Sequence, residues 1–232
     1  MEDWLTIDKI AEKIERKLHK INPHDFLSDL FECGAIAVSN RFDFSQAEER
    51  EERYLSIMKS HDKDTRVLMM DIFTDISFLL ERQINSYVGF DDYLGKLYMK
   101  SGTSNNRAGQ FFTPYHVSKL VADAGIDEER IQKHKQDDDV MVMMEPSCGS
   151  GGLVLATADV LYNKYDFNFS WNMFAKCSDL DKRCVHMSYL QLGLAGIPAE
   201  IEWADSMTGK VMEKWRTPAM MMFWERFERY SR

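Results

Sequence analysis

A run of five apolar residues at positions 140–144 is the clearest feature of the hydrophobic pattern, and it ends at Glu145. Such an uninterrupted run predicts a strand that is covered on both faces, as in a parallel sheet. Three glycines between positions 149 and 152 predict a tight turn at which the backbone can approach a ligand closely. Residues 153–162 have the apolar-rich pattern of a helix, whose first amides would point back at the turn. The pattern therefore predicts a strand, a glycine loop and a helix, with a ligand above the end of the strand.

Two further segments repeat the pattern of a strand that ends in an acid. Residues 173–181 form a short strand that closes on Asp179, about thirty residues after the first strand, which is the spacing of a strand–helix–strand unit. Residues 182–194 predict an amphipathic helix, and residues 199–206 alternate apolar and polar positions up to Asp205. A single acid after a strand is more commonly a turn residue or a helix cap. Three acids at the same end of consecutive units favour a ligand site.

The composition of the loop distinguishes between candidate ligands. A dinucleotide fingerprint requires a glycine where Val154 stands, and a phosphate-binding P-loop requires a Gly-Lys-Ser/Thr sequence that this chain lacks. An acid ahead of the glycines would repel a pyrophosphate but would suit a cationic or hydroxyl-rich ligand. S-adenosylmethionine (SAM) offers a sulfonium, an amino group and a ribose. The alternative is a glycine turn that binds no ligand.

At residues 91–99, 109–114 and 145–152 the chain resembles the SAM-dependent N6-adenine DNA methyltransferases, and most closely the modification subunits of type I restriction systems. The first two segments resemble the family's lead-in and its FxTP motif, which borders the methionine moiety of SAM. The third, Glu-Pro-Ser-Cys-Gly-Ser-Gly-Gly, resembles the D/E-P-x-C-G-S-G-G loop and is the most specific match. Asp179-Leu-Asp181 resembles the acidic ribose motif. Asp205-Ser206 resembles a Gly-Asp-Ser turn near the adenine, although Ala204 replaces the glycine.

The resemblance, which covers about half of the chain, implies which residues hold SAM. Glu145 would hold the amino acid end, Asp179 the ribose and Asp205 the adenine. Residue type alone also makes Thr113 a helix N-cap and Pro114 a residue of the first helical turn. The two aromatics before them pack equally well on the protein core or on a cofactor. The implied cofactor-binding residues are Phe111, Phe112, Thr113, Pro114, Glu145, Pro146, Ser147, Cys148, Gly149, Ser150, Gly151, Asp179, Leu180, Asp205 and Ser206.

The family's catalytic (Asn/Asp/Ser)-Pro-Pro-(Tyr/Phe) motif is missing from this chain. In that motif a polar side chain and a proline carbonyl bind the exocyclic amine, and the aromatic stacks on a flipped base. None of the five prolines is followed by a second proline. Residues 22–26 imitate the motif most nearly, but they follow an amphipathic helix instead of a buried strand. The catalytic residues are therefore unknown, and residues 207–232 are too few for the four further strands of a complete methyltransferase sheet.

Length and composition set outer bounds. At 232 residues and 44% hydrophobic, the chain can bury a core in one or two domains, and no apolar stretch approaches the length that spans a membrane. The first residues lack the pattern of a signal peptide, and the four cysteines lack Cys-x-x-Cys spacing. We therefore expect a cytoplasmic protein with reduced thiols, encoded by a bacterium, a phage or a mobile element. His116 and His186 lack neighbours at ligand spacing, so no metal is expected.

The net charge of −9 argues against strong stand-alone DNA binding, because DNA binders usually present a basic face to the phosphates. DNA would then be bound with the help of a partner, which could be a specificity-type subunit or a second copy of the chain. Basic residues gather in residues 210–232 but alternate with glutamates. This segment predicts a solvated helix face more strongly than a phosphate-binding tail.

The chain as a whole predicts an α/β fold, namely a truncated Rossmann-like SAM-dependent methyltransferase sheet preceded by an α-helical N-terminal domain. Helical periodicity at residues 8–21 and 65–87 places the helical domain in residues 1–100 and the α/β domain in residues 101–232. Residues 219–224 fit a strand or a terminal helix equally well. We expect residues 218–224 to cover the edge of the strand at 140–144 that the missing strands would otherwise pair.

The leading functional prediction is a SAM-binding DNA adenine-N6 methyltransferase-like protein of a restriction-modification or mobile-element system. Methyl transfer would then go directly to an amine without a covalent enzyme intermediate. The first alternative is a catalytically inactive SAM-fold subunit that acts by binding a partner. The second is a SAM-dependent enzyme with an acceptor other than DNA.

Overall fold

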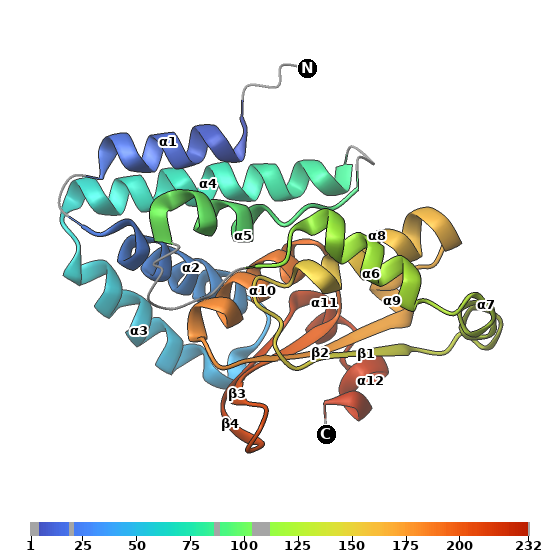
Figure 1. Ribbon diagram of the computed structural model, residues 1–232. Helices are drawn as coiled ribbons and strands as arrows, with labels where there is room; N and C mark the ends of the chain where they lie inside the picture. The colour runs from blue at the N-terminus through green and yellow to red at the C-terminus, as the bar shows by residue number, and fades with distance from the viewer. Residues whose placement is uncertain (1–4, 19–20, 86–88, 104–111, 232) are drawn as a thin grey trace.

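The computed structural model describes residues 5–18, 21–85, 89–103 and 112–231, which form a mixed α/β structure (Figure 1). The described helices that precede the sheet are α1 (Ile7–Lys17), α2 (Pro23–Ser39), α3 (Ala47–Ser60), α4 (Lys63–Asn85), α5 (Tyr93–Tyr98), α6 (Tyr115–Gly125) and α7 (Glu128–Asp137). A 3₁₀ turn, η1 (Phe44–Gln46), precedes α3, and a π-helical turn, η2 (Met99–Thr103), follows α5.

The described residues form one four-stranded sheet in the order β1-β2-β3-β4. Its strands are β1 (Met141–Glu145), β2 (Met173–Asp179), β3 (Ala199–Asp205) and β4 (Lys210–Arg216). The first three strands are parallel, and β4 is antiparallel to β3. They are connected through α8 (Gly152–Tyr165), the short α9 (Phe169–Asn172) and α10 (Lys182–Leu194). The three predicted strands and the predicted helix at residues 182–194 are therefore confirmed.

The strand β1 lies at the edge of the described sheet, and one of its faces is open. Met141 and Met143 pack against the main core, whereas 44% of Val142 and 71% of Met144 are exposed. The prediction that residues 140–144 are covered on both faces is therefore wrong. An apolar run indicates a strand, but which faces are covered depends on the elements that pack beside it.

The C-terminal residues form a strand and short helices where one solvated helix face had been predicted. Residues 210–216 form β4, in which Lys214 and Arg216 make ion pairs with the fully buried Glu200 of β3. The chain then continues through α11 (Pro218–Met222), α12 (Trp224–Phe227) and the 3₁₀ turn η3 (Glu228–Tyr230). The prediction of a solvated basic helix at residues 210–216 is therefore wrong.

The terminal helices pack at the start of β1 and β2. Met220 and Phe227 form a small buried cluster with Val140 and Phe174, on the side of the sheet opposite α6 and α8 (Figure 1). Residues 218–224 are thus a helix for most of their length, and they cover the beginning of β1. The later positions of β1, Val142 among them, stay exposed.

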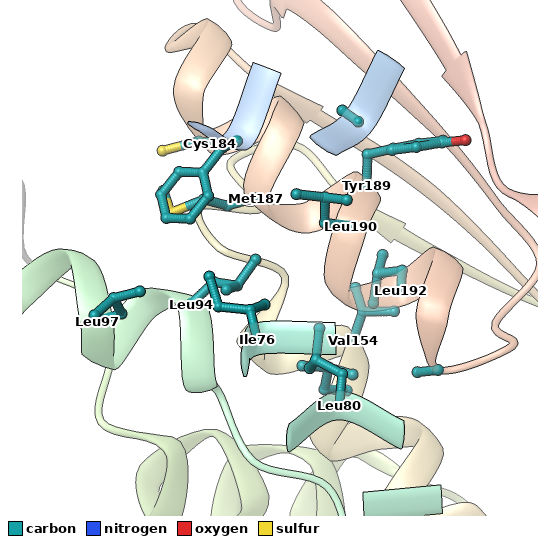
Figure 2. Packing of buried hydrophobic residues seen from close by; sticks show 14 of the residues in the cluster. Ile76, Leu80, Leu94, Leu97, Val154, Cys184, Met187, Tyr189, Leu190 and Leu192 are labelled. Carbon is teal, nitrogen blue, oxygen red and sulfur yellow. The ribbon is translucent and has the colours of Figure 1, made fainter. Parts of the chain in front are cut away.

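One hydrophobic core joins the early helices to the α/β elements. Leu94 of α5 and Ile76 of α4 lie toward Met187 and Leu190 of α10 in Figure 2. All four side chains are at most 2% exposed. Arg50 of α3 adds a polar link, because its guanidinium lies 3.8 Å from the Trp215 ring and donates to the Lys214 carbonyl of β4. The helices before β1 are therefore fixed against the layer that carries the glycine loop.

Candidate cofactor-binding site

The loop between β1 and α8 is shaped by its glycines. Gly149 has a φ of 54° and Gly151 a φ of 90°, which side chains other than glycine rarely adopt. The Gly151 amide donates to the Cys148 carbonyl at 2.8 Å, and the Cys148 amide donates to the Ser178 carbonyl of β2 at 2.9 Å. The loop therefore turns tightly over the ends of β1 and β2, as its sequence predicted.

Asp179 at the end of β2 holds this loop directly. Its carboxylate accepts the Gly149 amide at 2.9 Å and the Asp181 amide at 2.8 Å. Burial raises the pKa of Asp179, and the two backbone hydrogen bonds act in the opposite direction. Two accepted bonds leave further lone pairs on the carboxylate for a ligand hydroxyl.

A cavity of about 620 Å³ opens above the loop. Such a volume lies in the range of roughly 300–1,000 Å³ that is usual for small-molecule sites. The walls combine acids, loop atoms and apolar side chains. The lining residues are Asp92, Phe112, Thr113, Ser118, Val121, Glu145, Ser147, Cys148, Gly149, Ser150, Gly152, Leu153 and Asp179.

The three strand-terminal acids are staggered along the sheet. Glu145 is the register partner of Cys177, which lies two residues before Asp179 on β2. Asp179 in turn is the register partner of Trp203, which lies two residues before Asp205 on β3. Each step of two residues rises by roughly 7 Å along a strand. Glu145 and Asp179 therefore both line the cavity, whereas Asp205 lies beyond its lining.

Asp205 and Ser206 make local hydrogen bonds. The Asp205 carboxylate accepts hydrogen bonds from the backbone amides of Met207 and Thr208. The Thr208 hydroxyl and these two amides lower the pKa of Asp205. The Ser206 hydroxyl donates to the Pro146 carbonyl at 2.5 Å. These are the turn-capping contacts that an aspartate after a strand commonly makes. The role of both residues at the adenine stays a prediction.

The segment before α6 reaches the cavity through Phe112 and Thr113. The Phe112 ring lies 3.1 Å from the position that a Cβ would take on Gly149, so it packs against the loop. Phe111 lies outside the described residues. Thr113 was predicted as the N-cap of α6, but Pro114 holds that position without a side-chain bond. Pro114 lines an adjoining hollow of about 550 Å³.

Two other predicted residues contribute backbone contacts. Leu180 is 69% exposed, and its carbonyl accepts the Trp203 indole N–H at 3.0 Å. The Pro146 carbonyl accepts the Ser178 hydroxyl at 3.2 Å. Neither residue lines the cavity itself.

Asp92 is a wall residue that sequence reasoning did not assign to the site. It caps α5, is 4% exposed, and lines both the cavity and the adjoining hollow. Burial raises the pKa of Asp92 despite hydrogen bonds from Ser150, Gln191 and Gly95. The signal available in the sequence was an aspartate three residues before Gly95, which is the spacing of a helix cap.

The wall residues fit the groups of SAM. The carboxylates of Glu145 and Asp179 suit an ammonium group and ribose hydroxyls, and Phe112, Val121 and Leu153 supply apolar contact. The loop lacks the lysine that a phosphate-binding P-loop requires. The donor set therefore favours a ligand with a cation and hydroxyls over a nucleoside polyphosphate.

Comparison with known proteins identifies the family of the chain. Residues 91–223 match the family model described as N-6 DNA Methylase, so the chain belongs to the N-6 DNA methylase family. The matched segment includes α5, the glycine loop, the three parallel strands and β4. The comparisons with curated proteins and with solved structures find no match.

In the described part of the chain, no group of three or more His, Cys, Asp or Glu side chains could hold a metal ion. Among the helices of the described residues, none is long and apolar enough to cross a membrane.

Proposed function

We propose that this chain binds SAM in the cavity above the β1–α8 loop and acts as a DNA adenine-N6 methyltransferase-like protein of a restriction-modification or mobile-element system. The observation that carries the proposal is that Glu145 and Asp179 line one cavity above the glycine loop. When bound, SAM supplies the methyl group that is transferred. The chain would combine a Rossmann-like sheet with a preceding helical domain of about 100 residues, and it would act in the cytoplasm.

We expect each wall residue to meet a different part of SAM. Asp179 would accept ribose hydrogen bonds with the lone pairs that the Gly149 amide does not use. Glu145, whose side chain accepts the Ser147 amide at 3.3 Å, would meet the ammonium of the amino acid end. Phe112 and Thr113 would close the methionine side of the site. Asp205 and Ser206 would contact the adenine only at the outer edge of the cavity.

One sequence observation supports an alternative function. The Pro-Pro motif that binds the target amine in the family is absent from this chain. The chain would then be a SAM-fold subunit whose partner, such as a specificity-type subunit or a second copy, helps to bind DNA. Both functions use the same cofactor site. They differ in which chain supplies the contacts to the target amine. A SAM-dependent enzyme that methylates another acceptor is the remaining candidate.

Titration calorimetry with SAM and with S-adenosylhomocysteine tests the cofactor site. Asp179→Ala should weaken binding roughly tenfold or more, because hydrogen bonds to a charged group contribute about 1.5–3 kcal/mol. Asp137→Ala, at an exposed position on α7, is the matched control and should bind as the wild type does. No heat with either ligand from well-folded wild-type protein would overturn the SAM proposal. Equal binding by Asp179→Ala would overturn only the role of Asp179.

A further inference from the structure

A buried polar network joins the glycine loop to two helices. The Ser150 hydroxyl of the loop donates to Asp92 Oδ2 at 2.6 Å. The Asp92 Oδ1 atom accepts hydrogen bonds from the Gly95 backbone amide at 2.9 Å and from the Gln191 side-chain amide at 2.8 Å. Gln191 of α10 also donates to the Ser150 carbonyl at 2.7 Å and accepts the Leu94 amide at 3.0 Å. All the hydrogen-bonding atoms of the Gln191 side chain thus have partners. A fully satisfied buried network of this kind specifies one arrangement of the elements it joins.

Glycines in two elements leave room for the Asp92 carboxylate. A Cβ on Gly95 would stand 2.2 Å from Asp92 Oδ2, and a Cβ on Gly152 would stand 3.1 Å from the same atom. A side chain at Gly95 would displace the carboxylate, and one at Gly152 would press against it. The position of Asp92 is therefore set by α5 and by the first residue of α8 together.

Asp92 is too deeply buried to offer its carboxylate readily to a ligand. Both of its oxygens accept bonds from protein groups, and the residue is only 4% exposed. Its Ser150 partner, by contrast, lines the cavity together with the neighbouring Gly149. Asp92 thus acts on the site indirectly, through its hydrogen bond with Ser150.

We infer that Asp92 is a positioning residue that fixes the glycine loop in its ligand-binding shape through the Ser150 hydroxyl, with Gln191 as the second anchor. The inference rests on the proposed function for the identity of the ligand, which is SAM. The ordering of the loop itself does not depend on any ligand.

The test measures two quantities separately, namely the hydrogen exchange of the loop amides in the ligand-free protein and the affinity for SAM. In hydrogen exchange of the ligand-free protein, Ser150→Ala should speed exchange of the Gly149 and Gly151 amides about tenfold. The same variant should weaken SAM binding by a similar factor in calorimetry. Ser60→Ala is the matched control, because it makes the same chemical change and the Ser60 hydroxyl donates to the Ile57 carbonyl within its own helix α3. This control should leave both measurements unchanged.

A double-mutant cycle separates positioning from general loss of structure. If Asp92 acts through Ser150, the combination of Ser150→Ala with Asp92→Asn should weaken SAM binding by clearly less than the product of the two single effects. Independent effects of the two changes, or wild-type exchange of the loop amides in Ser150→Ala, would overturn the inference. A wild-type protein that binds no SAM would overturn the proposed function, while the exchange measurement would still decide the role of Asp92.

Discussion

Under the proposed function, single side chains of the site combine structural and ligand-binding roles. Asp179 both ends β2 and accepts the Gly149 amide, so the loop is already held where a ribose would bind. Burial raises the pKa of Asp179 and also that of Asp92, so keeping these two carboxylates charged near neutral pH opposes folding. Such unfavourable charges are typical of functional sites, where geometry is maintained at the expense of stability.

The buried His186 should make the protein sensitive to mild acid. It is 2% exposed, packs edge-on against Trp215, and burial lowers its pKa to about 3. Glu32 acts in the opposite direction as the next largest influence, and Lys182, Arg50 and Arg53 add to the lowering. Because the folded-state pKa lies below the unfolded value of 6.5, the unfolded chain takes up the proton first. Stability is therefore lost progressively from pH 6.5 toward pH 3.

Replacing His186 isolates this effect. Between pH 7.5 and pH 5 the wild type should lose about 2 kcal/mol more unfolding free energy than His186→Phe, as follows from linkage at a single histidine. Urea unfolding at the two pH values measures the difference, and groups common to both proteins cancel. His116→Phe, at an exposed position on α6, should behave like the wild type. Parallel losses in wild type and His186→Phe would contradict the assignment.

At the level of elements, the strands and helices with clear apolar periodicity could be predicted from sequence, whereas β4 could not. Its charged residues suggested a solvated helix because their partners stand in another strand. Arg216 is the register partner of Glu200 and Lys214 that of Glu202, so these charges are neutralised across the β3–β4 pair. The local sequence pattern does not show such pairing of charges between strands. The open face of β1 escaped prediction for the same reason.

Part of the candidate site also followed from sequence. Glu145, Asp179 and the glycine loop were found because glycines and acids at strand ends have local signatures. Asp92 was not assigned to the site, because its distance from Ser150 is 58 positions along the chain and only the packing of α5 against α10 brings them together. Asp205 shows the converse, since its motif resembles a ligand contact while the register places it outside the cavity lining.

The terminal helices should stabilise the sheet through one aromatic contact. Phe227 of α12 is fully buried and stacks on Phe174 of β2 with ring centres 6.1 Å apart. Phe227→Ala should therefore lower the free energy of unfolding by about 3–5 kcal/mol, measured by chemical denaturation. Phe223→Ala, at a position that is 38% exposed, is the matched control and should cost clearly less. Equal small losses would show that α12 contributes little to the sheet.

For the molecule as a whole, the distribution of charge determines how DNA can be approached. The chain carries a net charge of −9, and Lys214 and Arg216 are already engaged by glutamates of β3. Phosphate contacts supply much of the affinity of DNA-binding proteins, and an acidic chain offers few of them. The open positions Val142 and Met144 add apolar surface at the strand that carries Glu145. Exposed apolar strand edges commonly serve as contact surfaces for another polypeptide.

The final prediction follows from the charge and from the missing catalytic motif. The isolated chain should bind SAM but transfer methyl groups to duplex DNA no faster than Asp179→Ala does, because nothing in this sequence matches the motif that binds a flipped adenine. Tritiated methyl transfer to mixed-sequence duplex DNA at about 50 mM salt, where phosphate contacts are strongest, measures this. Wild-type turnover well above that of Asp179→Ala would show that this chain itself supplies the target contacts. The catalytic residues would then have to be sought among segments without the Pro-Pro signature, such as the Trp215–Ala219 stretch, which runs from the end of β4 into α11.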